Sequence, residues 1–257
     1  MQTFKSELKK ILTIRSTYIL TVGFFLLTAT VAFYVHGYKN SSADAAGGAS
    51  SNIFVASSIT QISTTLSVAG AIIALLLAAH EYRHNTIVYT LTASNSRTRV
   101  LLSKIAAVIL FVFVYSLLAG VASLGAMYAG IALSGHTLVH QDVNFVVFFA
   151  KVVFFCEAYA LAGMLFAFLI RNQVGAIAAL FVLPGTVEGL LTLILKHNAV
   201  YLPFTALSQV AVPSSSVEHI NSPSGYLTPA HGALVFTLWI VGSYLIAWYL
   251  FLKRDAN

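Results

Sequence analysis

Six long apolar runs dominate this chain and restrict what it can fold into. We predict that they lie at about 18–35, 59–79, 101–133, 145–170, 174–195 and 232–252. Each run has the roughly 20 apolar residues that an α-helix needs to cross a bilayer. Charged residues make up 9% of the chain, whereas water-soluble domains carry roughly 25%. The chain is therefore predicted to be an all-α, polytopic integral membrane protein whose residues 1–257 form a single transmembrane domain.

Residues 3–17 are predicted to form an amphipathic helix at the membrane interface, leading into the first span. Its apolar side chains share one helical face: Phe4, Leu8, Ile11 and Leu12. Its charged side chains lie largely on the other face: Lys5, Glu7, Lys9 and Lys10. The long charged lead, without a clean small-x-small cleavage site before the next loop, favours a retained span over a signal peptide.

The Lys and Arg residues lie in the gaps between the apolar runs, so the net charge of +6 indicates topology rather than nucleic-acid binding. With the N-terminus in the cytoplasm, eleven of them are cytoplasmic, two (Lys39 and Lys196) are on the outer side, and Lys151 is inside a span. The positive-inside rule therefore predicts that both termini are cytoplasmic. We expect a multi-pass protein of the plasma (inner) membrane of a bacterium.

A polar segment, 80–104, separates the second and third runs (HEYRHNTIVYTLTASNSRTRVLLSK). It holds four cationic side chains: Arg83, Arg97, Arg99 and Lys104. Within it, Ile87, Val88 and Leu91 fall at helical spacing. The pattern predicts a short cytoplasmic helix that is offered to a partner.

The same segment begins with His80-Glu81-Tyr82-Arg83-His84, which matches the H-E-x-x-H signature of zinc metalloproteases. A working zinc site needs a third protein ligand, and no fitting His or Asp lies nearby. The protease is therefore a remote alternative, and we predict no metal site.

No phosphate-binding G-x-x-x-x-G-K-[ST] motif is present, so energy for active transport would have to come from a partner or an ion gradient.

Charged residues inside spans are costly and point to function or to structural pairing. Glu157 falls near the middle of the fourth span. Lys151 and Glu188 lie at similar depth in the fourth and fifth spans, which a three-residue connection makes neighbours, so we predict an ion pair between them. Pro184-Gly185 is predicted to kink the fifth span.

Two further patterns concern the faces of the spans. Thr60, Thr64 and Ser67 share one face of the second span and could line a polar path with Glu157, or could bond to their own backbone. Small residues recur at helix-contact spacing and predict packing seams: Gly70, Ala74, Ala78, Ala122, Ala126 and Gly130. The outer connection 196–230 contains an apolar part too short to cross, interrupted by Pro203, which fits helices that dip into the outer leaflet and return.

Several segments, taken in order, carry a resemblance to a known family. The lead SELKKILTIRSTY precedes the first span, YLPFTAL (201–207) precedes the last, and LKRDA follows it. Between the second and third spans lies a block that carries Glu81, Tyr82, Arg83, Thr86, Leu91, Arg97 and Lys104. With this order and spacing, nearly the whole chain resembles the membrane subunit of type-2 ABC exporters, permeases that work with a separately encoded ATPase. Asn85 stands where that family often has Gly.

The resemblance implies that 80–104 carries a coupling helix seated in a cleft of the ATPase, with the seven residues of the block as its coupling residues. Two copies of the chain, or this chain with a related one, would enclose a substrate path and work by alternating access. ATP and Mg would be bound by the partner, and this chain would hold no cofactor and hydrolyse nothing. A secondary transporter and a non-transporting membrane scaffold remain alternatives, and the substrate is not indicated.

Overall fold

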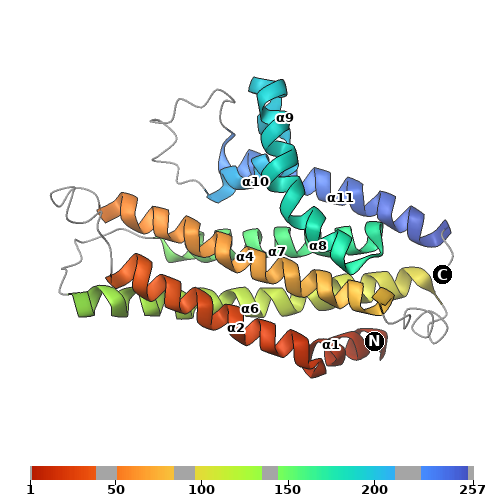
Figure 1. Ribbon diagram of the computed structural model, residues 1–257, viewed down its shortest axis with the longest axis horizontal. Helices are drawn as coiled ribbons and strands as arrows, with labels where there is room; N and C mark the ends of the chain where they lie inside the picture. Colours follow the sequence, from red (N-terminus) through yellow and green to blue (C-terminus); the bar gives the residue numbers. More distant parts are fainter. Residues whose placement is uncertain (1, 39–50, 84–95, 135–143, 212–226, 254–257) are drawn as a thin grey trace.

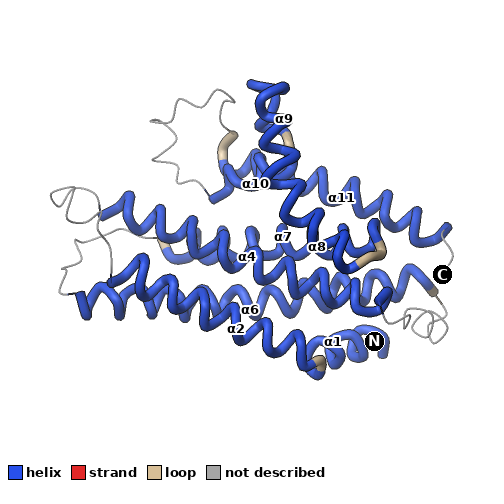
Figure 2. The backbone as a smooth tube through the Cα atoms, in the orientation of Figure 1, coloured by secondary structure: helices blue, strands red, loops and turns tan. Residues whose placement is uncertain are grey.

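The computed structural model describes residues 2–38, 51–83, 96–134, 144–211 and 227–253. The first half of this part consists of α1 (Gln2–Thr13), α2 (Arg15–Val31), the π-helix η1 (Ala32–Tyr38), α4 (Ser51–Arg83) and α6 (Arg97–Ser134). The second half consists of α7 (Phe145–Ile170), α8 (Gln173–Val182), the π-helix η2 (Leu183–Val187), α9 (Glu188–Leu195), the 3-10 helix η3 (Lys196–Tyr201), α10 (Pro203–Ala211) and α11 (Pro229–Lys253). Figures 1 and 2 show helices throughout and no strand in the described chain.

The predicted number of spans is confirmed. Six helices or continuous helical runs are long and apolar enough to cross a membrane. Their bounds differ from the prediction chiefly at α4 and α6, which extend beyond the apolar runs into the polar segment 80–104. Backbone hydrogen bonds can continue a helix past the hydrocarbon boundary, so the apolar pattern underestimates helix length.

The amphipathic helix is shorter than the predicted 3–17. α1 ends at Thr13, and Ile14 has an extended backbone (φ −74°, ψ 116°) before α2 begins at Arg15. The extended residue interrupts the helical hydrogen bonds and lets the chain turn, so α1 and α2 point in different directions (Figure 1). α1 thus lies against α6 rather than continuing into the first span.

α4, α6 and α7 run side by side through the centre of the bundle (Figure 1). Small residues allow this close approach, as predicted for the second span: Gly70 lies against the backbone of Cys156, and Ala74 and Ala78 are buried in the main core. Gly130 of α6 meets Gly37 of η1 backbone to backbone. These seams lie within the chain, and van der Waals packing of this kind drives helix association in lipid.

Replacing Gly163 by alanine should weaken the contact between α4 and α7. A Cβ at this position would lie 2.5 Å from the carbonyl oxygen of Ala71, so the helices must separate. We expect a loss of about 1–3 kcal/mol in the free energy of unfolding, the usual cost of overpacking. Gly242→Ala in α11 is the matched control, because a Cβ there meets nothing within 4 Å. Denaturation in mixed micelles measures both variants, and equal stabilities would contradict the close approach.

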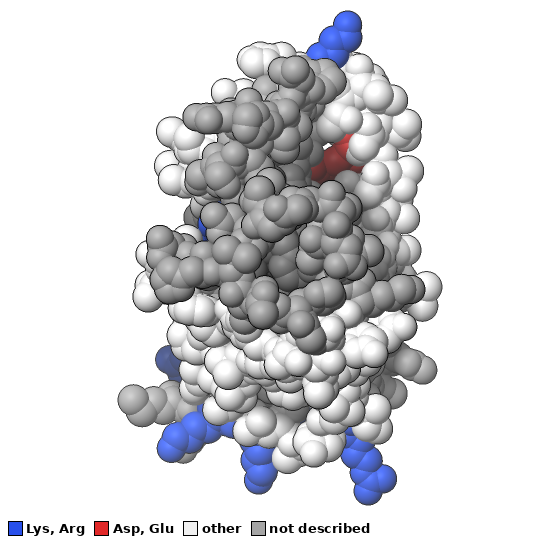
Figure 3. All heavy atoms as spheres, turned by 90° about the vertical axis from the view of Figure 1, so that its left-hand side faces the viewer, with Lys and Arg blue, Asp and Glu red and all other residues white. Residues whose placement is uncertain are grey.

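Both chain ends of the described part lie at the same end of the bundle. α1, the end of α4, the start of α6 and the end of α11 gather there (Figure 1). An even number of spans requires this arrangement. Viewed from the opposite end, most of the described surface carries no charge, and Lys and Arg stand at the upper and lower edges (Figure 3).

The fifth span is divided where Pro184-Gly185 predicted a kink. The α-helix gives way to the π-helix η2 over Leu183–Val187, and α9 then leaves the bundle at a different angle (Figure 2). Pro and π-helical turns are recognised causes of such bends. α9 leads into η3 and α10, two short helices that precede α11 in the region where returning helices were predicted.

Candidate functional site

Four charged side chains form a cluster at the base of the connection between α4 and α6. The ammonium group of Lys104 lies 2.8 Å from Oε2 of Glu7 and 2.7 Å from Oε1 of Glu81. The ammonium group of Lys10 lies 2.8 Å from Oε1 of each carboxylate. Two cations and two anions from three helices are thus joined in one network.

Three members of this network are withdrawn from solvent. The Lys104 side chain is 5% exposed and those of Glu7 and Glu81 are 10% and 9% exposed, whereas Lys10 is 36% exposed. Charges can be buried at acceptable cost only when paired and hydrogen-bonded, and each of these groups has at least one ion-pair partner, although Oε2 of Glu81 has none among the described residues. Burial lowers the pKa of Lys10, but hydrogen bonds and charge from Glu7 and Glu81 outweigh it and raise the pKa above its usual value. Lys10 therefore stays charged at neutral pH.

The orientation of α1 brings Glu7 into the network. Ile11, one helical turn after Glu7, is buried against the bundle, and Glu7 shares this inward face. Leu12, by contrast, is 65% exposed. The sequence placed Glu7 on the solvent-facing side with the lysines, and this was wrong because the inward face of α1 meets protein as well as lipid.

A second set of contacts ties the start of α6 to the end of α11. The guanidinium group of Arg97 donates hydrogen bonds to the carbonyl oxygens of Phe251 and Leu252, at 3.3 Å each. The indole N–H of Trp248 donates to the hydroxyl of Thr98 at 3.3 Å. A cation at the C-terminus of a helix also interacts favourably with its dipole. The segment that leaves α4 and enters α6 is thus held to α1 at one point and to α11 at another.

The predicted coupling residues fall into two groups. Glu81, Arg97 and Lys104 are described, and all three make the contacts given above. Tyr82 and Arg83 end α4, but their side chains lie outside the described structure, as do Thr86 and Leu91 entirely.

Glu188 does not pair with Lys151, contrary to the prediction. Its carboxylate accepts hydrogen bonds from the backbone N–H groups of Phe204 and Thr205, at 2.9 and 2.7 Å, and from the hydroxyl of Thr205 at 2.9 Å. In the described chain no ion pair joins it to Lys151. The α10 N-terminus offers unpaired N–H groups and the positive end of a helix dipole, which satisfy a buried carboxylate without a lysine.

The residues predicted to line a polar path lie in different surroundings. Ser67 is fully buried and its hydroxyl donates to the carbonyl oxygen of Thr64 at 2.8 Å, so the backbone-bonded alternative holds for this residue. Thr64 is exposed, and the side chain of Thr60 lies outside the described structure. Glu157 differs, because both of its carboxylate oxygens are buried without a hydrogen-bond partner among the described residues.

Comparison with known protein families identifies the chain. A model of the ABC-2 family of transporter proteins matches residues 3–184, which include all four members of the charged cluster. The chain belongs to this family. No curated protein matches it.

As an ABC-2 permease subunit, the chain is a multi-pass membrane protein of the transporter rather than its catalytic component. In the structure, the glutamate of the H-E-x-x-H match belongs to the charged cluster. Oε1 of Glu81 accepts hydrogen bonds from Lys10 and Lys104, and the Glu81 side chain is 9% exposed, so this carboxylate belongs to the ion-pair network. His84 lies outside the described chain, within which no three potential metal ligands come together.

Sequence analysis of this ABC-2 permease missed Glu7 and Lys10 as site residues. Their one signal was an i,i+3 pair of opposite charge in a helix whose other charges are all positive. The backbone partners of Glu188 left no signal, because N–H groups at the start of α10 belong to any residue type.

Proposed function

We propose that this permease is the membrane subunit of an ATP-driven exporter and that the charged cluster transmits the movement of its ATPase. The observation that carries the proposal is the junction of α1, α4 and α6 through Glu7, Lys10, Glu81 and Lys104. It lies where the chain leaves the bundle toward the predicted coupling helix. A movement of that segment would therefore be transmitted to all three helices at once.

In this proposal, the partner ATPase binds segment 80–104 from the cytoplasm. ATP and Mg bind to the partner, and closure of two ATPases pulls the segments of two permease copies. Glu81 and Lys104 would pass the movement to α1, while Arg97 would pass it to α11 through its bonds to Phe251 and Leu252. Switching between two arrangements of such packed helices is how alternating access would arise.

Glu157 is the residue of the proposed substrate path that has structural support. Its carboxylate is inside a span and accepts no hydrogen bond from the described residues. A buried polar group without a partner is costly, and functional sites are where such costs are retained. We place it on the path with Thr64, whose side chain is exposed.

Removing residues 85–92 should abolish ATPase binding and export while leaving the permease in the membrane. The deleted residues are the predicted docking element, whereas the contacts of Glu81, Arg97 and Lys104 lie outside the deletion. Co-purification from the native host in mild detergent, with ATPase activity read on the same sample, measures the effect. Leu91→Pro should reproduce it with a single substitution.

The matched control removes eight residues, 42–49, from the connection between η1 and α4. This deletion should preserve ATPase binding, because η1 ends and α4 starts at the end of the bundle opposite to the end of α4 and the start of α6 (Figure 1). An ATPase that binds equally well to both deletion variants would refute docking at 80–104. A permease that exports without any ATPase would favour a secondary transporter.

A further inference from the structure

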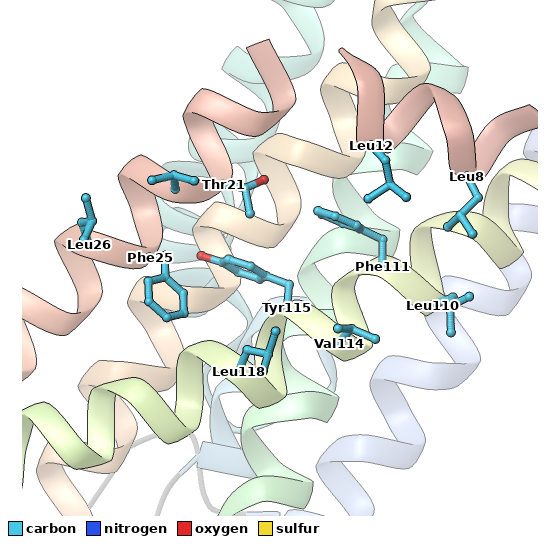
Figure 4. Close-up of a pocket in the computed structure, with 11 residues that line it drawn as sticks. Leu8, Leu12, Thr21, Phe25, Leu26, Leu110, Phe111, Val114, Tyr115 and Leu118 are labelled. Carbon is cyan, nitrogen blue, oxygen red and sulfur yellow. The ribbon is translucent and has the colours of Figure 1, made fainter. Parts of the chain in front are cut away.

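An apolar groove of about 440 Å³ opens on the side of the bundle between α1, α2 and α6 (Figure 4). Its lining comes from all three helices and includes Leu8, Leu12, Phe25, Leu26 and Leu118. Leu12, Leu26 and Leu118 are among the most exposed large apolar residues of these helices. Figure 4 shows Leu8 and Leu12 pointing down from α1 toward Phe111 of α6.

The position of the groove indicates what fills it. α2 and α6 are candidate spans, and α1 is an amphipathic helix with exposed lysines, so the groove lies in the hydrocarbon layer next to the interface. The volume is within the roughly 300–1,000 Å³ of small-molecule sites. If the groove were empty, the side chains that line it would lose van der Waals contacts. The acyl chains of lipids are the apolar molecules available at this depth, so we expect them to fill it.

The charges around the groove indicate the headgroup. Arg15 is exposed and precedes Val22 and Leu26 by seven and eleven residues, which puts all three on one face of α2. At 1.5 Å per residue, Arg15 lies roughly 10 Å from Val22 along the helix, toward the interface. Lys5 and Lys9 of α1 are also exposed. An anionic phospholipid would therefore meet cations at its headgroup and the groove with its chain.

We propose that this groove binds one acyl chain of an anionic phospholipid whose headgroup lies at Arg15. The bound chain holds Leu8 and Leu12 of α1 against α2 and α6. Because α1 also carries Glu7 and Lys10, lipid in the groove supports the charged cluster. The proposal concerns a resident lipid and is independent of the ATPase.

Photolabelling of the full-length permease in nanodiscs tests this site. The probe is phosphatidylglycerol with a diazirine in one acyl chain, at a low fraction in phosphatidylcholine, and the labelled peptides are mapped by mass spectrometry. Label should concentrate on the groove residues of α2 and α6. Filling the groove with Leu26→Trp and Leu118→Trp should reduce this label at least about tenfold, which corresponds to about 1.4 kcal/mol. Leu245→Trp in α11 is the matched control, since Leu245 is 57% and Leu26 59% exposed.

A competition experiment tests whether the site prefers an anionic headgroup. Unlabelled phosphatidylglycerol should displace the probe better than phosphatidylcholine, and Arg15→Gln should reduce that preference about fivefold, because one cation near the surface contributes about 1 kcal/mol. Lys196→Gln, beyond α9, should leave the preference unchanged.

Three results would overturn the proposal. Label spread evenly over all lipid-facing helices would mean that the groove does not bind lipid in preference to the rest of the surface. Cross-links from the groove to a second permease copy would make it a protein interface. Loss of the label during ATP turnover of the complex would identify the occupant as cargo.

Discussion

Replacing Lys104 by methionine should destabilise the permease by about 3–5 kcal/mol, the usual cost of removing one partner from a buried ion pair. Lys104 is 5% exposed and joins Glu7 and Glu81, whose carboxylates are also buried. Methionine retains the apolar stem, so the loss comes from the missing cation. Lys10 touches both carboxylates but cannot replace Lys104, because it occupies the more exposed side of the network. Denaturation in mixed micelles measures the change in the free energy of unfolding.

Lys10→Met is the matched control for this variant. Lys10 contacts the same two carboxylates but is 36% exposed, so water screens its loss. We expect about 1 kcal/mol or less, as for surface ion pairs. Adding Glu7→Gln and Glu81→Gln to Lys104→Met should recover part of the loss, because neutral amides need no counter-charge. If the two lysine variants are equally stable, the cluster is not a buried network.

Export should fall more in Lys104→Met than its lower stability explains. At a temperature where the variant remains folded, ATPase binding should persist while transport is lost, because the docking segment is intact and its connection to α1 is not. Transport at the normal rate in the folded variant would remove the cluster from the coupling mechanism.

The second large effect is expected from Glu188→Ala, which should cost about 2–4 kcal/mol. The substitution leaves the N–H groups of Phe204 and Thr205 and the hydroxyl of Thr205 without their acceptor. Hydrogen bonds to a charged group are each worth about 1.5–3 kcal/mol. Removing the carboxylate also leaves its donors buried without an acceptor, and this adds to the loss in the free energy of unfolding. α10 should loosen from α9, and denaturation in mixed micelles again provides the measurement.

Two variants calibrate this effect. Glu188→Gln keeps one acceptor oxygen and should lose less than Glu188→Ala. Thr205→Ala removes only the hydroxyl donor and should cost about 1 kcal/mol, the net value of an ordinary hydrogen bond. A cost of Glu188→Ala no greater than that of Thr205→Ala would mean that the carboxylate does not cap α10.

The sequence was informative wherever the physical requirement is local. A bilayer demands about 20 apolar residues per span, and the six runs that meet this demand became the six spans. Pro184 lacks an N–H for the helical hydrogen bond, and the helix changes type at that point. Arg97 and Lys104 drew attention because cations gather at the edges of spans, and Glu81 because it lies in the H-E-x-x-H match and in the block that carries the family resemblance.

The pairing of charges was decided by tertiary structure. Glu7 and Lys104 are 97 residues apart, and Lys10 and Glu81 are 71 residues apart. Depth in the bilayer suggested Lys151 as the partner of Glu188, but depth says nothing about the direction in which a side chain leaves its helix. That direction is set by packing of small residues such as Gly163 against a neighbouring backbone.

What the sequence determined by itself was therefore the class of protein, the number of spans and the place where the fifth one breaks, since each follows from the chemistry of neighbouring residues in one segment. What only the tertiary structure decided was the rotation of each helix about its axis. This rotation turned Glu7 inward to Lys104, gave Glu188 the N-terminus of α10, and opened the groove beneath α1. It depends on contacts between segments far apart in the chain, which no local pattern encodes.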